Sequence, residues 1–147
     1  MFFLKKLPTR QMTEHYGALY PEMDVDLVED ALLMMRKASL LIRELDAYFK
    51  SYDLSLLRFL ILMVIDREPG RTSLSLGEIG ARVDVSKPVM TRTIKALVSD
   101  DLITVAQDSE DKRSKFVALT KKGVVKLETV LPEYFALITQ FMGSQDE

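Results

Sequence analysis

The stretch SLGEIGARVDVSKPVMTRTIKALVSDDLITVAQDSEDKRSKFVALTKKG, from Ser75 to Gly123, decides the fold of this chain. Its patterns predict a helix, a short turn, a second helix, a strand, a charged loop and a second strand, in that order. A helix-turn-helix followed by a β-hairpin can place one helix in a DNA major groove and the hairpin tip in the neighbouring minor groove. The sequence therefore predicts a mainly α fold with a small β-hairpin wing.

The first helix of this stretch has a clear start signal. Ser75 and Glu78 have capping-box spacing, in which a hydroxyl and a carboxylate satisfy free backbone donors of the first turn. The apolar residues that recur at helical spacing after them are Leu76, Ile79 and Val83. A turn at residues 84–85 then separates this helix from the next.

The second helix has one apolar face and one polar, basic face. Ser86 is placed to cap it, and Pro88 falls in the first turn, where a missing N–H costs nothing. The apolar face consists of Met90, Ile94, Leu97 and Val98. Arginine, lysine and threonine suit phosphates and base edges, and Pro88 or Val89 suits a thymine methyl group. The candidate DNA-contacting residues of this recognition helix are Ser86, Lys87, Pro88, Val89, Thr91, Arg92 and Lys95.

The two strands and their charged loop carry a family resemblance. Residues 102–105 and 115–119 are predicted strands, and the segment from Asp108 to Gly123 resembles the wing signature of the MarR (multiple antibiotic resistance regulator) family of bacterial transcription factors. The resemblance extends over residues 24–142 and implies a winged helix-turn-helix with N- and C-terminal dimerisation helices. It also implies that the wing arginine, here Arg113, enters the minor groove.

The resemblance assigns further roles, and the chain departs from the family pattern at three places, one of which is Lys112, where relatives frequently have arginine. In relatives the wing aspartate, here Asp111, holds the arginine or a neighbouring group in place. The candidate wing residues are Asp111, Lys112, Arg113 and Lys115. Relatives usually carry basic residues where this chain has Val105 and Ala106, and a basic residue plus glycine where it has Asp100-Asp101. The latter two departures reduce the positive charge near the DNA groove.

Two long helices are expected to flank the winged region, residues 53–119, within a single domain of residues 1–147. Residues 24–52 carry two adjacent apolar stripes, more than one neighbouring helix covers. Residues 120–142 carry one stripe interrupted by Pro132, which should kink the helix or begin a second one. Internal core packing explains part of this pattern, and a homodimer interface, as in the family, explains the rest. The candidate interface residues are Val28, Leu32, Leu131, Tyr134, Ile138 and Phe141.

Composition excludes several classes of protein. The chain has 147 residues, 48% hydrophobic content and a net charge of −2, which suits one soluble domain and argues against a nucleic-acid coat protein. It has no cysteine and a single histidine, His15, so no disulfide, thiolate zinc site or His-based triad can form. The apolar run of residues 59–65 is far too short for a membrane span and predicts a buried helix. We therefore expect a cytoplasmic protein that is not an enzyme and has no metal or cofactor.

These observations predict a homodimeric, sequence-specific DNA-binding regulator, a repressor by preference, acting on a pseudo-palindromic double-stranded operator. A small-molecule effector could release it from DNA by favouring one spacing of the two recognition helices. The candidate effector pocket is lined by Met34, Tyr48 and Met63, although plain packing explains these residues equally. The alternative is a winged-helix protein-interaction or dimerisation module with weak or no DNA binding, of which a dimerisation segment like those attached to some methyltransferases is a special case.

Overall fold

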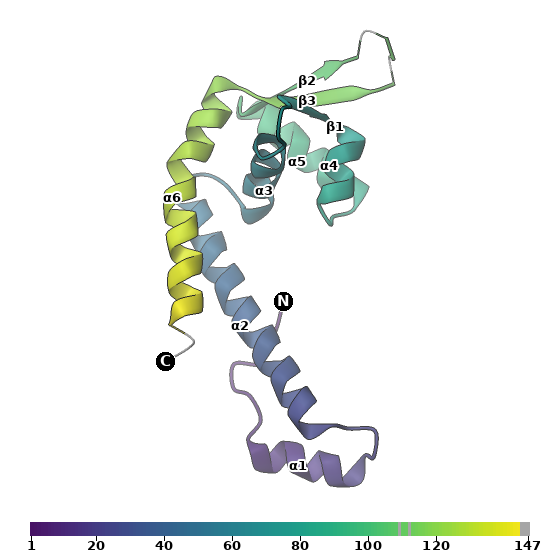
Figure 1. Cartoon of the computed structure of the whole chain (residues 1–147), viewed down its shortest axis with the longest axis vertical. Coiled ribbons are helices and arrows are strands. Elements are labelled where there is room, and N and C mark those ends of the chain that lie inside the picture. The colour runs from purple at the N-terminus through teal and green to yellow at the C-terminus, as the bar shows by residue number, and fades with distance from the viewer. Residues whose placement is uncertain (109, 112, 145–147) are drawn as a thin grey trace. The chain divides into compact units, whose positions relative to one another are not determined.

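The computed structural model describes residues 1–108, 110, 111 and 113–144 of the chain, and Figure 1 shows its helices and strands. The chain divides into two compact units, Met1–Leu45 and Asp46–Glu147. Within the described residues the elements are, in chain order, α1 (Arg10–Leu19), α2 (Val25–Lys50), α3 (Leu56–Asp66), β1 (Ser73–Ser75), α4 (Leu76–Arg82), α5 (Lys87–Ser99), β2 (Ile103–Gln107), β3 (Lys115–Leu119) and α6 (Lys121–Gly143).

Helix α3 forms the core of the second unit, as its uninterrupted apolar sequence predicts. Ser55 caps the helix by accepting a hydrogen bond from the backbone N–H of Arg58. Phe59 is completely buried, and its ring stacks on Phe49 with 4.3 Å between the ring centroids. Burial of one such aromatic side chain contributes about 1.5–3 kcal/mol, so this helix anchors the elements around it.

The strands form one antiparallel sheet in the order β1-β3-β2. The hairpin of β2 and β3 confirms the predicted wing, whereas the sequence predicted no strand at β1. This strand has only three residues, Ser73–Ser75, and alternation of polar and apolar residues indicates a strand only when it extends over four or more residues. It pairs with β3 so that Leu74 lies opposite Val117, and both side chains are completely buried.

Helix α6 continues without a break through Pro132, so no second helix begins there. Proline lacks the N–H that would bond to the carbonyl of Glu128, four residues earlier. Glu128 lies on the exposed surface, where water can satisfy that carbonyl. One missing hydrogen bond on the solvent side therefore leaves the helix intact.

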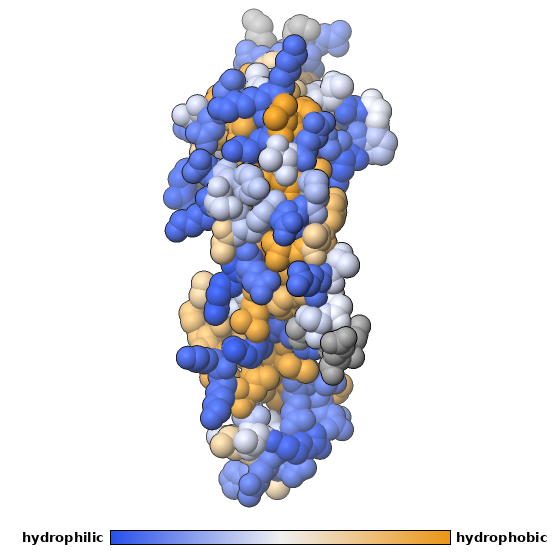
Figure 2. All heavy atoms as spheres, turned by 90° about the vertical axis from the view of Figure 1, so that its left-hand side faces the viewer, coloured by the Kyte–Doolittle hydropathy of each residue, from blue (hydrophilic) through white to orange (hydrophobic). Residues whose placement is uncertain are grey.

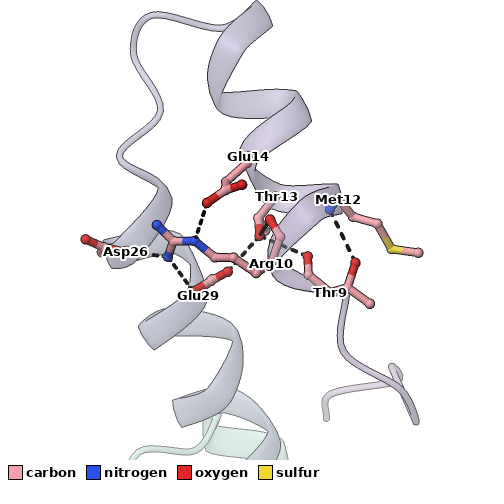
Figure 3. A network of polar contacts seen from close by, with 7 residues as sticks. All are labelled: Thr9, Arg10, Met12, Thr13, Glu14, Asp26 and Glu29. Atoms are coloured by element: carbon pink, nitrogen blue, oxygen red, sulfur yellow. Dashed lines mark hydrogen bonds and ion pairs between the residues drawn. The ribbon is translucent and has the colours of Figure 1, made fainter.

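The first unit also contains a helix, α1, that the sequence did not predict. Thr9 caps α1 by accepting from the backbone N–H of Met12. Figure 3 shows the guanidinium of Arg10 between the carboxylates of Glu14, Asp26 and Glu29. These contacts join α1 to the first two turns of α2.

Thr13 completes this polar network from the buried side of α1. Only 3% of the residue is exposed, and its hydroxyl donates to Glu29 at 2.7 Å. The Thr13 hydroxyl, followed by the Arg10 guanidinium, lowers the pKa of the Glu29 carboxyl below its ordinary value.

Among the described residues, no helix combines the length and the apolar character that crossing a membrane requires.

Candidate nucleic-acid interface

The capping box predicted at the start of α4 is present. The Ser75 hydroxyl accepts from the backbone N–H of Glu78 at 3.1 Å, and the Glu78 carboxylate accepts from the backbone N–H of Ser75 at 3.0 Å. The guanidinium of Arg71 binds the same carboxylate through both terminal nitrogens. Glu78 therefore connects the first turn of α4 with Ser75, at the end of β1, and with Arg71, which precedes β1.

The Glu78 carboxylate makes the stability of this turn pH-dependent. Its hydrogen bonds with the Arg71 side chain and then with the Ser75 backbone lower its pKa from 4.5 to about 2. A group whose pKa is lower in the folded state stabilises the fold above its unfolded-state pKa, and this stabilisation is lost as the pH falls towards the folded-state pKa. Between about pH 5 and pH 2.5 we expect the wild type to lose more stability than Glu78→Gln. Urea unfolding at both pH values measures this difference, and equal losses would contradict the assignment.

Helix α5 presents the polar face that the sequence predicted. Ser86 caps the helix, and Met90, Ile94 and Leu97 bury its inner face. Val98 was assigned to this inner face but is 43% exposed, because it lies at the edge of the stripe beside an open groove. The predicted contact residues that the structure places in exposed positions are Ser86, Lys87, Pro88, Thr91, Arg92 and Lys95, and Val89 is half-buried.

The basic side chains of this face have no acidic partners. Within the described ranges, Lys87, Arg92 and Lys95 make no ion pair, whereas Arg58, Arg71 and Arg82 each pair with a carboxylate. An unpaired cation on a helix surface remains available for an external anion. The outer face of α5 is therefore positively charged, and its cations are available to bind an external anion.

The wing turn is shaped by Asp111. One of its carboxylate oxygens accepts from the backbone N–H of Arg113 at 2.9 Å, and the other accepts from the hydroxyl of Ser114 at 3.1 Å. The carboxylate thus organises the backbone around Arg113. No ion pair between the two side chains is found in the described part of the wing, and both residues are exposed. Lys112, also predicted as a wing residue, lies outside the described residues.

A groove of about 690 Å³ connects the recognition helix with the wing. Thr91 and Lys95 of α5 line one side, and Val105 and Lys115 of the wing strands line the other. Helix α4 also lines the groove through Gly77 and Gly80, which have no side chains to fill it. The structure therefore brings three of the predicted helix residues, Lys87, Thr91 and Lys95, to the same groove as Lys115 of the predicted wing.

The other predicted sites lie elsewhere. Met34 is exposed in the first unit, and Tyr48 and Met63 are half-buried in the second, so their common effector pocket stays a prediction.

Of the predicted interface residues, Tyr134 packs within its own chain, with its ring centroid 4.6 Å from that of Phe59. The remaining interface candidates are all half-buried, namely Val28, Leu32, Leu131, Ile138 and Phe141.

Several apolar side chains of α2 and α6 that the sequence did not predict as interface residues are exposed. Figure 2 views the molecule from the left-hand side of Figure 1, and apolar patches interrupt the polar surface there. The exposed apolar residues of α6 are Val124, Val125, Phe135 and Met142, and those of α2 are Leu27, Leu33, Met34, Met35 and Ile42. Heptad-like spacing identifies an apolar stripe but does not reveal which of its members the chain covers by itself.

A helix-turn-helix with a free cationic second helix, followed directly by a β-hairpin, defines a winged helix-turn-helix protein. Comparison with known proteins narrows this class. The model of the MarR family matches residues 52–114. The HTH-type transcriptional repressor YetL of Bacillus subtilis is 31% identical over 146 residues, which cover 98% of this chain and 86% of that protein. The chain therefore belongs to the MarR family of transcriptional regulators.

Solved structures share the fold. AbsC, a MarR family transcriptional regulator from Streptomyces coelicolor, superposes with a TM-score of 0.75 at 17% identity, covering 84% of this chain and 82% of that one. A mutant of MarR from E. coli in complex with operator DNA superposes with a TM-score of 0.69 at 20% identity, covering 81% and 84%. At these identities the agreement concerns the winged-helix architecture alone.

Proposed function

We propose that this regulator binds double-stranded DNA sequence-specifically through α5 and the wing, and that it acts as a repressor. The observation that carries the proposal is a set of exposed cations that make no ion pair with any described residue: Lys87, Arg92 and Lys95 on the helix and Arg113 and Lys115 on the wing. Three of them, Lys87, Lys95 and Lys115, border the same groove. Two relatives in this fold support it, because one is named a repressor and another was solved with operator DNA.

The charge of the whole chain limits the strength of this binding. The net charge is −2, and the interval from Ser86 to Lys122 contains eight basic residues against five acidic ones. A sequence-specific protein needs only local positive charge, and each phosphate contact makes binding weaker as salt rises. We therefore expect modest affinity that decreases steeply with salt concentration.

The proposed functional state is a homodimer that reads a pseudo-palindromic operator. Apolar side chains as exposed as Leu27 at 66%, Met34 at 67% and Phe135 at 51% support a second copy, because burying such surface drives association. Two copies related by a two-fold axis would carry two recognition helices. The half-sites of the operator should then lie about one helical turn apart, roughly 34–36 Å.

Further parts of the proposal concern the site of action and its control. A protein that reads chromosomal operators works in the cytoplasm. Residues 24–52 and 120–142 would form the dimer, and residues 53–119 would bind DNA. A small molecule that contacts Met34, Tyr48 and Met63 would release the protein from its operator only if it binds the DNA-free arrangement of the protein more tightly than the DNA-bound one.

A mobility-shift titration tests the proposed function. The labelled duplex is the intergenic DNA beside the protein's own gene, and the competitor is an equal length of scrambled DNA. A retarded band that resists the scrambled competitor is the expected result, with one dimer bound per operator. The absence of any shift at low salt, with a folded dimer confirmed by analytical ultracentrifugation, would instead favour a protein-interaction module.

A further inference from the structure

A small hollow lies beside the recognition helix, on the side away from the groove. It measures about 170 Å³ and is lined by Ser55, Arg58, Val89, Arg92, Thr93 and Ala96. The first two residues come from the start of α3, and the other four form one stripe of α5. Two arginines from different helices thus border the same hollow, and none of the described residues that line it carries a carboxylate.

Asp100 extends this stripe by one helical turn beyond Ala96. Its carboxylate lies 3.4 Å from a guanidinium nitrogen of Arg58, which is long for a hydrogen bond between two charged groups. Both side chains are partly exposed, at 34% for Arg58 and 49% for Asp100. An exposed ion pair of this length is weak and easily exchanged for another anion.

The lining of the hollow suits a phosphate group. A guanidinium binds phosphate oxygens through two parallel hydrogen bonds, and Arg92 at the rim adds positive potential without having to touch the anion. The Ser55 hydroxyl accepts from the backbone N–H of Arg58 at 3.1 Å, so its own proton is free to be donated. Arg58 contacts Asp100 through the terminal nitrogen Nη1, and a phosphate bound through both terminal nitrogens needs the same nitrogen.

We propose that this hollow binds a phosphate of the DNA backbone through Arg58 and that Asp100 competes with the phosphate for Arg58. This proposal rests on the proposed function and extends it. Asp100 is a built-in attenuator, since the protein must break the Arg58–Asp100 pair each time it binds DNA. The chain carries this aspartate at the end of its recognition helix, where it lowers affinity for every sequence equally.

The test compares Asp100→Asn, Arg58→Ala and the double variant by fluorescence anisotropy on a labelled duplex of scrambled sequence, over a series of salt concentrations. Asp100→Asn should tighten binding about three- to tenfold, and Arg58→Ala should weaken it by a similar factor. One lost phosphate contact should reduce the salt slope by about 0.9 in Arg58→Ala. In the Arg58→Ala background, Asp100→Asn should change binding less than about twofold.

Asp101→Asn is the matched control, because it removes the same charge from the next residue. Asp101 makes no ion pair with any described residue, and its φ of 58° is one that asparagine tolerates. Its effect should stay below about twofold. Equal tightening by Asp100→Asn and Asp101→Asn, or additive effects in the double variant, would overturn the proposal in favour of a simple net-charge effect. Thermal unfolding of each variant verifies that it is folded.

Two further outcomes distinguish a failure of this inference from a failure of the proposed function. If the wild type binds no duplex at low salt, the proposed function and the attenuator both fail. If the wild type binds and the three variants match it, only the attenuator fails. Replacing chloride by inorganic phosphate at constant ionic strength distinguishes a backbone phosphate from a free anion. The gain from Asp100→Asn must persist there, and its loss would assign the hollow to free phosphate.

Discussion

Replacing Gly123 with alanine is expected to destabilise the second unit by about 3 kcal/mol or more. An added Cβ would lie 2.0 Å from the carbonyl oxygen of Leu102 and 3.0 Å from its carbonyl carbon. Both are backbone atoms and cannot move aside as a flexible side chain would. The same oxygen accepts from the backbone N–H of Thr120 at 3.1 Å, so moving it also breaks a hydrogen bond next to the start of α6.

Chemical denaturation measures this loss, with Gly80→Ala as the matched control. Gly80 is also helical, but nothing lies within 4 Å of the position where its Cβ would be. Alanine favours the helix there by up to about 1 kcal/mol, so this variant should be equal to or more stable than the wild type. A Gly123→Ala protein as stable as the wild type would show that α6 can start without this close approach to Leu102.

The second large effect concerns DNA binding by the two exposed arginines, Arg113 of the wing and Arg92 of the recognition helix. Arg113→Ala should weaken binding to all sequences by about tenfold, because the wing contributes electrostatic contact with little base readout. Arg92→Ala should instead relax the preference at one base pair by about 1–3 kcal/mol, since an arginine in the major groove reads guanine edges.

Competition experiments separate these roles. Each variant is titrated with the operator, with operators carrying single base-pair changes and with scrambled DNA. Arg67→Ala serves as the control, because this exposed arginine follows α3 and lies outside both candidate elements. Equal losses on specific and scrambled DNA for both Arg92→Ala and Arg113→Ala would contradict the division between reading and anchoring.

Local signals in the sequence were sufficient to predict the helix-turn-helix and the wing. Ser75 and Ser86 cap the helices that their positions predicted, because a cap depends on a side chain and a backbone N–H only two or three residues away. Apolar periodicity assigned the buried face of α5 correctly, except at the exposed Val98 on its edge.

The missed elements lacked such signals. Strand β1 exists because the edge of β3 provides a partner for it, and its own three residues do not specify a strand. Helix α1 has a polar sequence, and its contacts with α2 run through Arg10 and Thr13 to residues as distant as Glu29. Helices of this length need tertiary contacts for their stability.

The sequence by itself determined where the helices of the winged region begin, which face of α5 is basic and which family the wing resembles, because these properties depend on residues a few positions apart. The tertiary structure alone decided that Arg58 meets Asp100 across 42 positions of chain, that Leu102 closes on Gly123, and that the cations of α5 form no ion pair with any described residue. Such contacts depend on how completed elements pack against one another, and no short-range pattern encodes that packing.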